Sequence, residues 1–335
     1  MDDATTPPPW RLLHLLDGFV TTQLLYVAAK LDLATVLADG PRSGTEIASA
    51  VGADRDALVR VLRGLVIEGV LSEEDDGRFA LTPVGESLTA LRGAAIVRGE
   101  LYYGSAAGLL DTVLGRGTAF ERIHGARFFD HLADHPDHEA AFQASMAGRA
   151  EQEASAVVEA FDFSGIEQLV DVGGGGGILL AAILAAHPAV RGVLLDRPEA
   201  IAGARDRLES AGLADRADCV TGDFFDIVPA GADAYLLSRV LHDWNDDDVG
   251  RILTTCHRAM RRDSRLLIVE AIMPERAVDR PAAIRMDVHM LLLLGARERT
   301  AAEFAGLLGR AGFELTQVAM TASPAGLGVI EARLR

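Results

Sequence analysis

A histidine and a glycine-rich loop are the parts of this chain that could do chemistry together. His242 stands in the segment Ser238–Trp244, and five consecutive glycines, Gly173–Gly177, follow an apolar segment that ends in Asp171 and Val172. Glycines permit a tight turn, and the start of a following helix offers unpaired N–H groups, so the loop predicts a nucleotide-like cofactor. An imidazole at the edge of the same predicted sheet can remove a proton from a ligand. The pair therefore predicts one site that holds a cofactor and a proton acceptor.

Two glutamates are candidates to support His242. Histidine suits proton removal because its unperturbed pKa of ~6.5 leaves it neutral at cytosolic pH. A carboxylate behind the ring would fix its tautomer and stabilise the imidazolium. Glu270 ends an apolar strand and needs a partner there. Glu298 precedes a helix expected from Ala301, so it could instead be an ordinary charge at a helix start.

The glycine spacing restricts the cofactor. A dinucleotide fingerprint needs a glycine at position 178, which is isoleucine, so the pattern is Gly173, Gly175 and Gly177, the form used by ligands that lack a pyrophosphate. Asp196 follows the next apolar segment, where an acid can accept from ribose hydroxyls. Each feature alone has an ordinary explanation, a helix cap or a turn, but their order and spacing favour a nucleoside site.

A second acid and its neighbour extend this site. Asp223, in Gly222–Phe225, could accept from an adenine amino group, and Phe224 could pack against the ring.

Composition excludes some partners. The 335 residues include 32 basic and 49 acidic side chains, a net charge of −17, which repels phosphate backbones and anionic lipid. Neither nucleic acid nor a membrane is therefore expected as a partner. Cys219 and Cys256 are too few for a disulfide framework or a thiolate metal site, and no export signal is visible, so cytoplasmic residence is expected. No His, Asp and Glu cluster has convincing metal-ligand spacing, so catalysis without a metal is predicted.

The N-terminal half is predicted to be mostly helical. Residues 1–100 form one domain, in which a Ser43 start, a helix capped by Asp54 and a hairpin around the turn at 74–77 give a winged-helix pattern. Residues 101–160 are expected to be a helical connector that contributes to the substrate pocket. A DNA reader needs a positive face, and the acids of the would-be recognition helix cancel its arginines, so packing and dimerisation are favoured. Six histidines are expected mostly on solvated helix faces: His124, His131, His135, His138, His187 and His257.

Residues 161–335 change to strands that alternate with helices. This order predicts an α/β fold with a doubly wound, mainly parallel, Rossmann-like sheet. The expected strands are 168–172, 192–195, 217–221, 234–238, 265–270, 314–319 and 328–333. The expected helices are 178–186, 200–210, 246–260 and 301–311.

The motifs as a set resemble one family. The order DVGGG, LLDRP, GDFF and HDW is similar to the S-adenosylmethionine-dependent O-methyltransferases of the caffeate and bacterial polyketide type. The resemblance covers nearly the whole chain and implies a homodimer, an N-terminal helical dimerisation domain and a methyltransferase domain. It implies that S-adenosylmethionine (SAM) is the cofactor and that the acceptor is a hydroxylated aromatic or polyketide-derived small molecule. His242 would be the general base, flanked by Glu270 and Glu298.

The resemblance also assigns binding residues. The SAM site would comprise Gly173, Gly175, Asp196, Asp223, Phe224, Ser238 and Trp244. Ser238 departs from the lysine of many relatives, as bacterial polyketide members do, and Trp244 could equally be core. The acceptor site would comprise Phe142, Met146, Asp243, Met286, His289 and Met290, although core packing explains the first two nearly as well.

Three other functions compete with methyl transfer. The same scaffold can host decarboxylation, hydroxylation or ring closure while still binding the cofactor, but His242 with both glutamates favours methylation. A nicotinamide oxidoreductase is opposed by Ile178. A ligand-sensing regulator would explain the winged helix but requires an acidic protein to bind DNA.

Overall fold

The computed structural model describes residues 7–323 and 326–335, without the side chains of 147–149. Contacts divide the chain into two units, one ending at Gly148 and the other beginning at Arg149. The helix α12 (Pro136–Ala160) spans this boundary. The three-part division expected from the sequence, with a separate connector at 101–160, stays a prediction.

The first unit is mainly helical. Its helices before residue 71 are α1 (Pro8–Leu16), α2 (Gly18–Lys30), α3 (Leu33–Val36), α4 (Gly44–Val51) and α5 (Arg55–Ile67). The later ones are α6 (Pro83–Glu86), α7 (Leu88–Val97), a π-helical turn (Arg98–Tyr102), α8 (Tyr103–Ala106), α9 (Leu109–Val113), α10 (Ala119–His124) and α11 (Phe128–Asp134). The strands β1 (Arg42–Ser43), β2 (Leu71–Glu73) and β3 (Arg78–Leu81) form an antiparallel sheet in the order β1-β3-β2.

The two helices of the winged-helix pattern begin at the predicted caps, Ser43 and Asp54. The Ser43 hydroxyl accepts from the Glu46 amide, and the Glu46 carboxylate accepts from the Ser43 amide, which closes a capping box at the start of α4. The Asp54 side chain accepts from the Ala57 amide at the start of α5. Both helices bury one side against β2 and β3. The strand β1 was not predicted, because two residues are too few to show an alternating pattern.

One buried histidine differs from expectation. His131 on α11 is 6% exposed, and its Nε2 lies 3.0 Å from Nδ1 of His138 on α12. Its ring also contacts Phe120 edge-on. The expectation of a solvated histidine is therefore wrong at this position, because a helix-face pattern does not show which neighbouring helix covers it.

The second unit is a doubly wound α/β domain, as predicted. Its strands are β4 (Gln168–Val172), β5 (Arg191–Asp196), β6 (Ala217–Thr221), β7 (Ala234–Ser238), β8 (Arg265–Ala271), β9 (Phe313–Met320) and β10 (Leu327–Leu334). Its helices are α13 (Ile178–Ala186), α14 (Pro198–Ser210), α15 (Asp246–Ala259), α16 (Pro281–Leu293) and α17 (Ala301–Arg310). The sheet order is β6-β5-β4-β7-β8-β10-β9, in which only β10 runs antiparallel to both of its neighbours.

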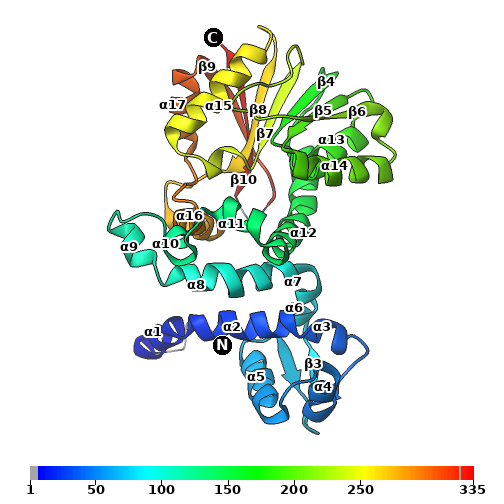
Figure 1. Cartoon of the computed structure of the whole chain (residues 1–335), viewed down its shortest axis with the longest axis vertical. Coiled ribbons are helices and arrows are strands. Elements are labelled where there is room, and N and C mark those ends of the chain that lie inside the picture. The colour runs from blue at the N-terminus through cyan, green and yellow to red at the C-terminus, as the bar shows by residue number, and fades with distance from the viewer. Residues whose placement is uncertain (1–6, 324–325) are drawn as a thin grey trace. The chain divides into compact units, whose positions relative to one another are not determined.

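Both faces of the central strands β4, β7 and β8 are buried, which explains their nearly continuous apolar sequences. Alternate residues point to opposite faces: Val170 and Tyr235 join one core cluster with α15 and α17, whereas Leu169 and Leu236 join another with α13 and α14. Figure 1 shows these two pairs of helices on opposite sides of the sheet. The helix α16 is not expected from the sequence, because its stretch is apolar without a helical period.

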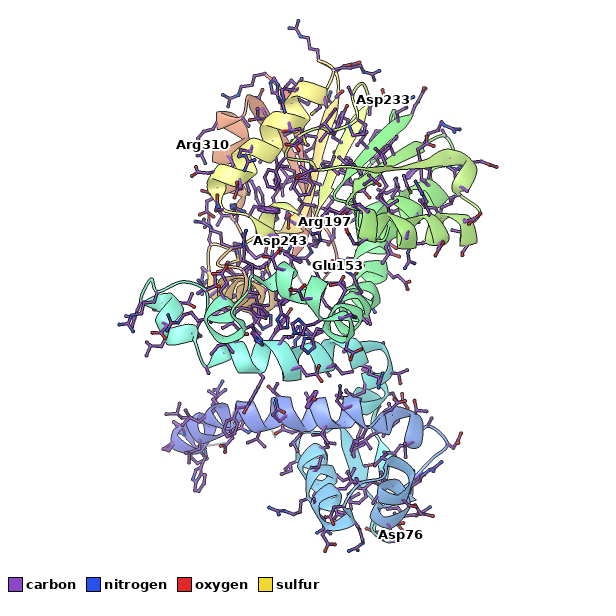
Figure 2. All side chains as sticks on the ribbon, in the orientation of Figure 1. Asp76, Glu153, Arg197, Asp233, Asp243 and Arg310 are labelled. Atoms are coloured by element: carbon purple, nitrogen blue, oxygen red, sulfur yellow. The ribbon has the colours of Figure 1, made fainter. Side chains whose placement is uncertain are left out.

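The strand order reverses between β4 and β7. Ligands bind doubly wound sheets at such a switch point, at the carboxyl ends of the strands. Figure 2 shows Arg197, Asp243 and Glu153 at this end of the sheet, while Asp233, which precedes β7, lies at the other end. The glycine loop and the His242 segment leave the sheet from β4 and β7, so the topology brings together two segments far apart in sequence.

No single helix in the described part of the chain is long and apolar enough to cross a membrane. The pair α1 and α2, bent by 46°, meets the length and composition criteria only when the two are taken together.

Candidate active site

The glycine loop is a tight turn between β4 and α13. Gly173, Gly175 and Gly177 have φ angles of 73°, 54° and 72°, a region that side-chain-bearing residues rarely adopt. A Cβ atom on Gly173 would lie 2.8 Å from Cγ2 of Val240. Glycine is therefore required at position 173 by both backbone conformation and the close approach of the segment after β7.

Asp196 faces this loop from the end of β5. Its Oδ2 accepts a hydrogen bond from the Gly175 amide at 2.7 Å, and its Oδ1 accepts from the Arg197 amide. Asp223 follows β6, and its Oδ1 accepts from the Phe225 amide. Asp223 makes no hydrogen bond to the glycine loop among the described residues.

An aromatic group closes the same end of the sheet. The Phe224 ring lies 3.4 Å from the position of a Cβ on Gly173, and its centroid is 6.1 Å from that of Trp244 in an edge-on contact. Ser238 is the half-buried last residue of β7. Thus Gly173, Phe224 and Trp244 come together, whereas Ser238 is placed only by its position at the strand end.

His242 lies in a short turn after β7 and is 6% exposed. Its Nδ1 is 2.9 Å from Oε1 of Glu298 and 3.8 Å from Oε2 of Glu270. Its Nε2 is 3.4 Å from Oδ1 of Asp243, which is partly exposed. Both predicted glutamates therefore surround Nδ1, and Nε2 is on the other side of the ring.

The two glutamates act differently. Oε1 of Glu270 accepts from the amides of Val240, Leu241 and His242 at 3.0, 2.8 and 3.4 Å, so this carboxylate shapes the turn that carries the imidazole. Glu298 makes the shorter contact with the ring. Its own amide donates to Oδ1 of Asp287 on α16.

The electrostatics of this cluster differ from the sequence expectation. Burial lowers the pKa of His242, but the negative charges of Glu270, Asp243 and Glu298 outweigh it and raise the pKa to about 9. Burial also raises the pKa of Glu270, although His242 opposes that rise. In the enzyme without ligands, the imidazole of His242 is therefore protonated at neutral pH. The expectation of an ordinary histidine pKa is wrong. A pKa near that of a phenol, ~10, suits proton exchange between the two groups.

Comparisons with known proteins identify the family. The model of the O-methyltransferase domain matches residues 107–314, and that of the O-methyltransferase dimerisation domain matches residues 13–90. The chain belongs to the O-methyltransferase family.

Relatives resemble the chain over almost its full length. Phenazine O-methyltransferase PhzM of Lysobacter antibioticus is 44% identical over 96% of this chain and 95% of its own. The solved structure of the mitomycin 7-O-methyltransferase MmcR is 34% identical, with a TM-score of 0.91 over 97% of each chain. The O-methyltransferase NcsB1, solved with SAM and 2-hydroxy-5-methyl naphthoic acid, is 33% identical, with a TM-score of 0.82 over 94% of this chain and 96% of its own.

SAM is the cofactor of this O-methyltransferase, and the switch-point residues fit it. SAM carries positive charge on sulfur and nitrogen, and this end of the sheet offers carboxylates. Asp171 at the end of β4 is buried, and its Oδ1 has no hydrogen-bond partner among the described residues. Burial and then the charge of Asp196 raise the pKa of Asp171 to about 7. A neighbouring cation would relieve this unfavourable burial.

Sequence reasoning missed four residues at or near the carboxyl ends of the strands. Asp171 was noted in the glycine motif without a role. Arg239, Glu153 and Arg299 gave no signal, because arginine and glutamate are common on surfaces and only the fold shows their burial. The Arg299 side chain is completely buried and donates to the carbonyls of Leu241 and Trp244 at 2.9 and 2.8 Å.

The predicted acceptor residues occupy three places. Asp243 lies beside Nε2 of His242. Met286, His289 and Met290 are on α16; Met290 is buried, and the other two are half-buried. Phe142 lies on α12 in the first unit, where its ring contacts Phe128 edge-on at 5.3 Å, and Met146 follows one turn later. The assignment of all six to the acceptor site stays a prediction.

Proposed function

We propose that the enzyme methylates a hydroxyl oxygen of an aromatic or polyketide-derived small molecule, with His242 as the general base. The observation that carries this proposal is the buried contact of 2.9 Å between Nδ1 of His242 and Glu298, at the switch point of the sheet. Nε2 is then the ring nitrogen available to take the hydroxyl proton.

SAM supplies an electrophilic methyl group when it is bound. Gly173, Gly175, Asp196, Asp223, Phe224, Ser238 and Trp244 would hold it at the carboxyl ends of the strands. A neutral hydroxyl is a poor nucleophile, so His242 accepts its proton at Nε2 as the oxygen gains the methyl group. Glu298 accepts the hydrogen bond from Nδ1–H and stabilises the resulting imidazolium. Transfer of a proton to such a base contributes typically ~10²–10⁴-fold to a rate.

The proposed acceptor is a flat, hydroxylated ring system. Relatives named for a phenazine and solved with a naphthoic acid support this class. Met286 and Met290 on α16 suit an aromatic face, because thioether groups pack well against π-systems. Asp243 and His289 would provide polar contacts to substituents.

We also propose a homodimer, because the dimerisation domain of the family is present. Nucleic acid is not a proposed partner, since Arg55 and Arg63 of α5 form ion pairs with Asp56 and Glu73 inside the first unit. No membrane partner is proposed either, because the net charge of −17 repels anionic lipid. Cys219 and Cys256 are free thiols, which suits the cytoplasm.

A resident metal is not part of this proposal, although donor atoms of His242, Glu270 and Glu298 lie within 4.8 Å of one another. Oε1 of Glu270 is engaged by three amides, and Nδ1 of His242 by Glu298. Loss of turnover on dialysis against a chelator, restored by a divalent cation, would contradict this part.

The test is a panel of hydroxylated phenazines, naphthoic acids and quinones incubated with SAM that carries an isotopically labelled methyl group. Mass spectrometry should find one labelled methyl group on an acceptor oxygen. Labelled nitrogen or carbon would overturn the choice of oxygen. An acceptor changed without gaining the label would instead indicate decarboxylation, hydroxylation or ring closure.

A further inference from the structure

Arg239 occupies an unusual backbone position next to the catalytic turn. Its φ angle is 56°, a left-handed conformation that only one other described non-glycine residue, Asp32, adopts. The Arg239 amide still donates to the Val269 carbonyl at 3.0 Å, which ends the pairing of β7 with β8. The next three amides turn to Glu270. Glycine would adopt this corner with less strain, so the side chain of Arg239 must contribute something that outweighs the strain.

The guanidinium of Arg239 lies between two carboxylates. Its Nη2 and Nε donate to the two oxygens of Glu153 on α12, at 2.7 and 3.4 Å. Its Nη1 lies 3.7 Å from Oε1 of Glu298. That oxygen is also the one 2.9 Å from Nδ1 of His242. Arg239 and His242 therefore approach the same carboxylate oxygen from two directions.

The charges around His242 are unbalanced without Arg239. Three acids, Glu270, Glu298 and Asp243, lie within 3.8 Å of the imidazole. The guanidinium of Arg299, which donates to the carbonyl of Leu241 in the same turn, is engaged by two carbonyls and by Asp246. Arg239 is thus the guanidinium that faces Glu298, and its side chain is 15% exposed while that of Glu298 is fully buried.

We propose that Arg239, anchored by Glu153, is a positioning residue that holds Glu298 against Nδ1 of His242 and balances its charge. This inference rests on the proposed role of His242 as base. Arg239 does not itself accept the proton. It keeps Glu298 in the orientation that leaves Nε2 to face the acceptor, and it limits how strongly the surrounding acids hold the proton on the imidazole.

The test compares Arg239→Met, Arg239→Lys and Glu153→Gln in the full-length enzyme. Arg239→Met should lower kcat by ~10–100-fold, the range typical of residues that orient a functional ligand, with KM and SAM affinity little changed. The rising limb of kcat/KM should move to higher pH, because a cation near His242 is lost. Arg239→Lys should restore the position of that limb in part, and Glu153→Gln should lower kcat less.

Arg265→Met is the matched control. Arg265 on β8 forms an ion pair of 3.0 Å with Glu331 on β10, and the two side chains are 16% and 8% exposed. The substitution therefore removes a similarly buried ion pair that does not contact His242. This variant should be less stable than the wild type, but its kcat/KM should rise over the same pH range. A drop in kcat with an unmoved limb in Arg239→Met, or an equal shift in Arg265→Met, would overturn the inference. If Arg239→Met does not fold, Arg239→Lys and Glu153→Gln provide the test. Wild-type values in both variants, for kcat and for the pH at which kcat/KM rises, would overturn the inference.

Failure of the proposed function gives a different result. Near-wild-type turnover by His242→Gln would show that His242 is not the base. Arg239 would then have no general base to position. Loss of turnover in His242→Gln, with a normal Arg239→Met, would leave the base in place and reject the role of Arg239 alone.

Discussion

Oε1 of Glu298 lies 2.9 Å from Nδ1 of His242, and both side chains are buried. A carboxylate can only accept, so Nδ1 carries the hydrogen in this contact. The ring is thereby fixed with Nε2 directed away from Glu298. A carboxylate on the side of the ring opposite the reacting nitrogen is the arrangement that orients a general base and stabilises its protonated form.

His242→Gln should reduce kcat by ~10²–10⁴-fold, because the proton acceptor is lost while the loop keeps its shape. SAM affinity should not change, since the glycine loop and Asp196 are untouched. Single-turnover rates and calorimetric titration with SAM check the two parts. Glu298→Gln is the companion variant: it keeps an acceptor for Nδ1–H but removes the charge, so a smaller loss is expected.

The pH dependence should follow the raised pKa of His242. Only the neutral imidazole accepts a proton, so kcat/KM should rise with pH up to about 9 rather than level off near 7. In Glu298→Gln the limb should move to lower pH, because one of the charges that raise the pKa is gone. A wild-type profile that is flat from pH 7 to 9 would contradict the protonated resting state.

The same shift predicts a trend in stability. The folded-state pKa of about 9 exceeds the ordinary 6.5, so charged His242 stabilises the fold fully below pH 6.5, and this contribution is lost as pH rises through 9. The expected size is on the order of 3 kcal/mol. Urea unfolding of the wild type and His242→Gln, measured at intervals from pH 6 to 10, should show the difference in free energy of unfolding shrink with rising pH.

Most of the second unit could be predicted from the sequence, because its strands are short apolar segments that alternate with helices and several of them are followed by glycine or an acid. The strand β4 and the helix α13 have the predicted bounds. Periodicity failed for α16, which is apolar without a period, and for β1, which is too short.

The candidate site divides in the same way. The acids at strand ends and His242 could be found because topology alone brings strand ends together. The ion pair of Arg239 with Glu153 could not, because it joins residues 86 positions apart, and neither belongs to a motif. The raised pKa of His242 was also out of reach, since it depends on the distances to three acids.

Asp171→Asn should stabilise the SAM-free enzyme at pH 8. The folded-state pKa of Asp171 is raised to about 7 from 3.8, so folding favours the protonated acid: its stabilising contribution is complete below pH 3.8 and lost as pH rises to 7. Asparagine escapes this cost, on the order of 4 kcal/mol at pH 8. The advantage should shrink below pH 7 and vanish near pH 4 in denaturant titrations. SAM affinity should fall in the variant if Asp171 faces its positive charge.

Two glycines of the loop should separate packing from cofactor contact. Gly173→Ala combines a left-handed backbone with a contact of 2.8 Å, whereas Gly175→Ala has the left-handed backbone and no described atom within 4 Å of its new Cβ. Both should lose ~1–2 kcal/mol from backbone strain, and Gly173→Ala a further ~1–3 kcal/mol from overpacking. Gly176→Ala, which has neither feature, is the control. If Gly175→Ala folds yet binds SAM as tightly as the control does, the loop does not hold the cofactor.

The dimer should depend on the apolar side chains of α1 and α2. Leu16 and Phe19 are 63% and 55% exposed, and Trp10 and Leu13 of α1 are exposed as well. Several exposed apolar side chains in one short segment favour contact with a second copy of the chain, because the contact removes their apolar surface from water. Leu16→Asp with Phe19→Asp should convert the protein to a monomer in sedimentation velocity. The control is Ile227→Asp, at an apolar position of the second unit that is 68% exposed, and this variant should stay dimeric. A double variant that sediments like the wild type would place the interface elsewhere in the dimerisation domain.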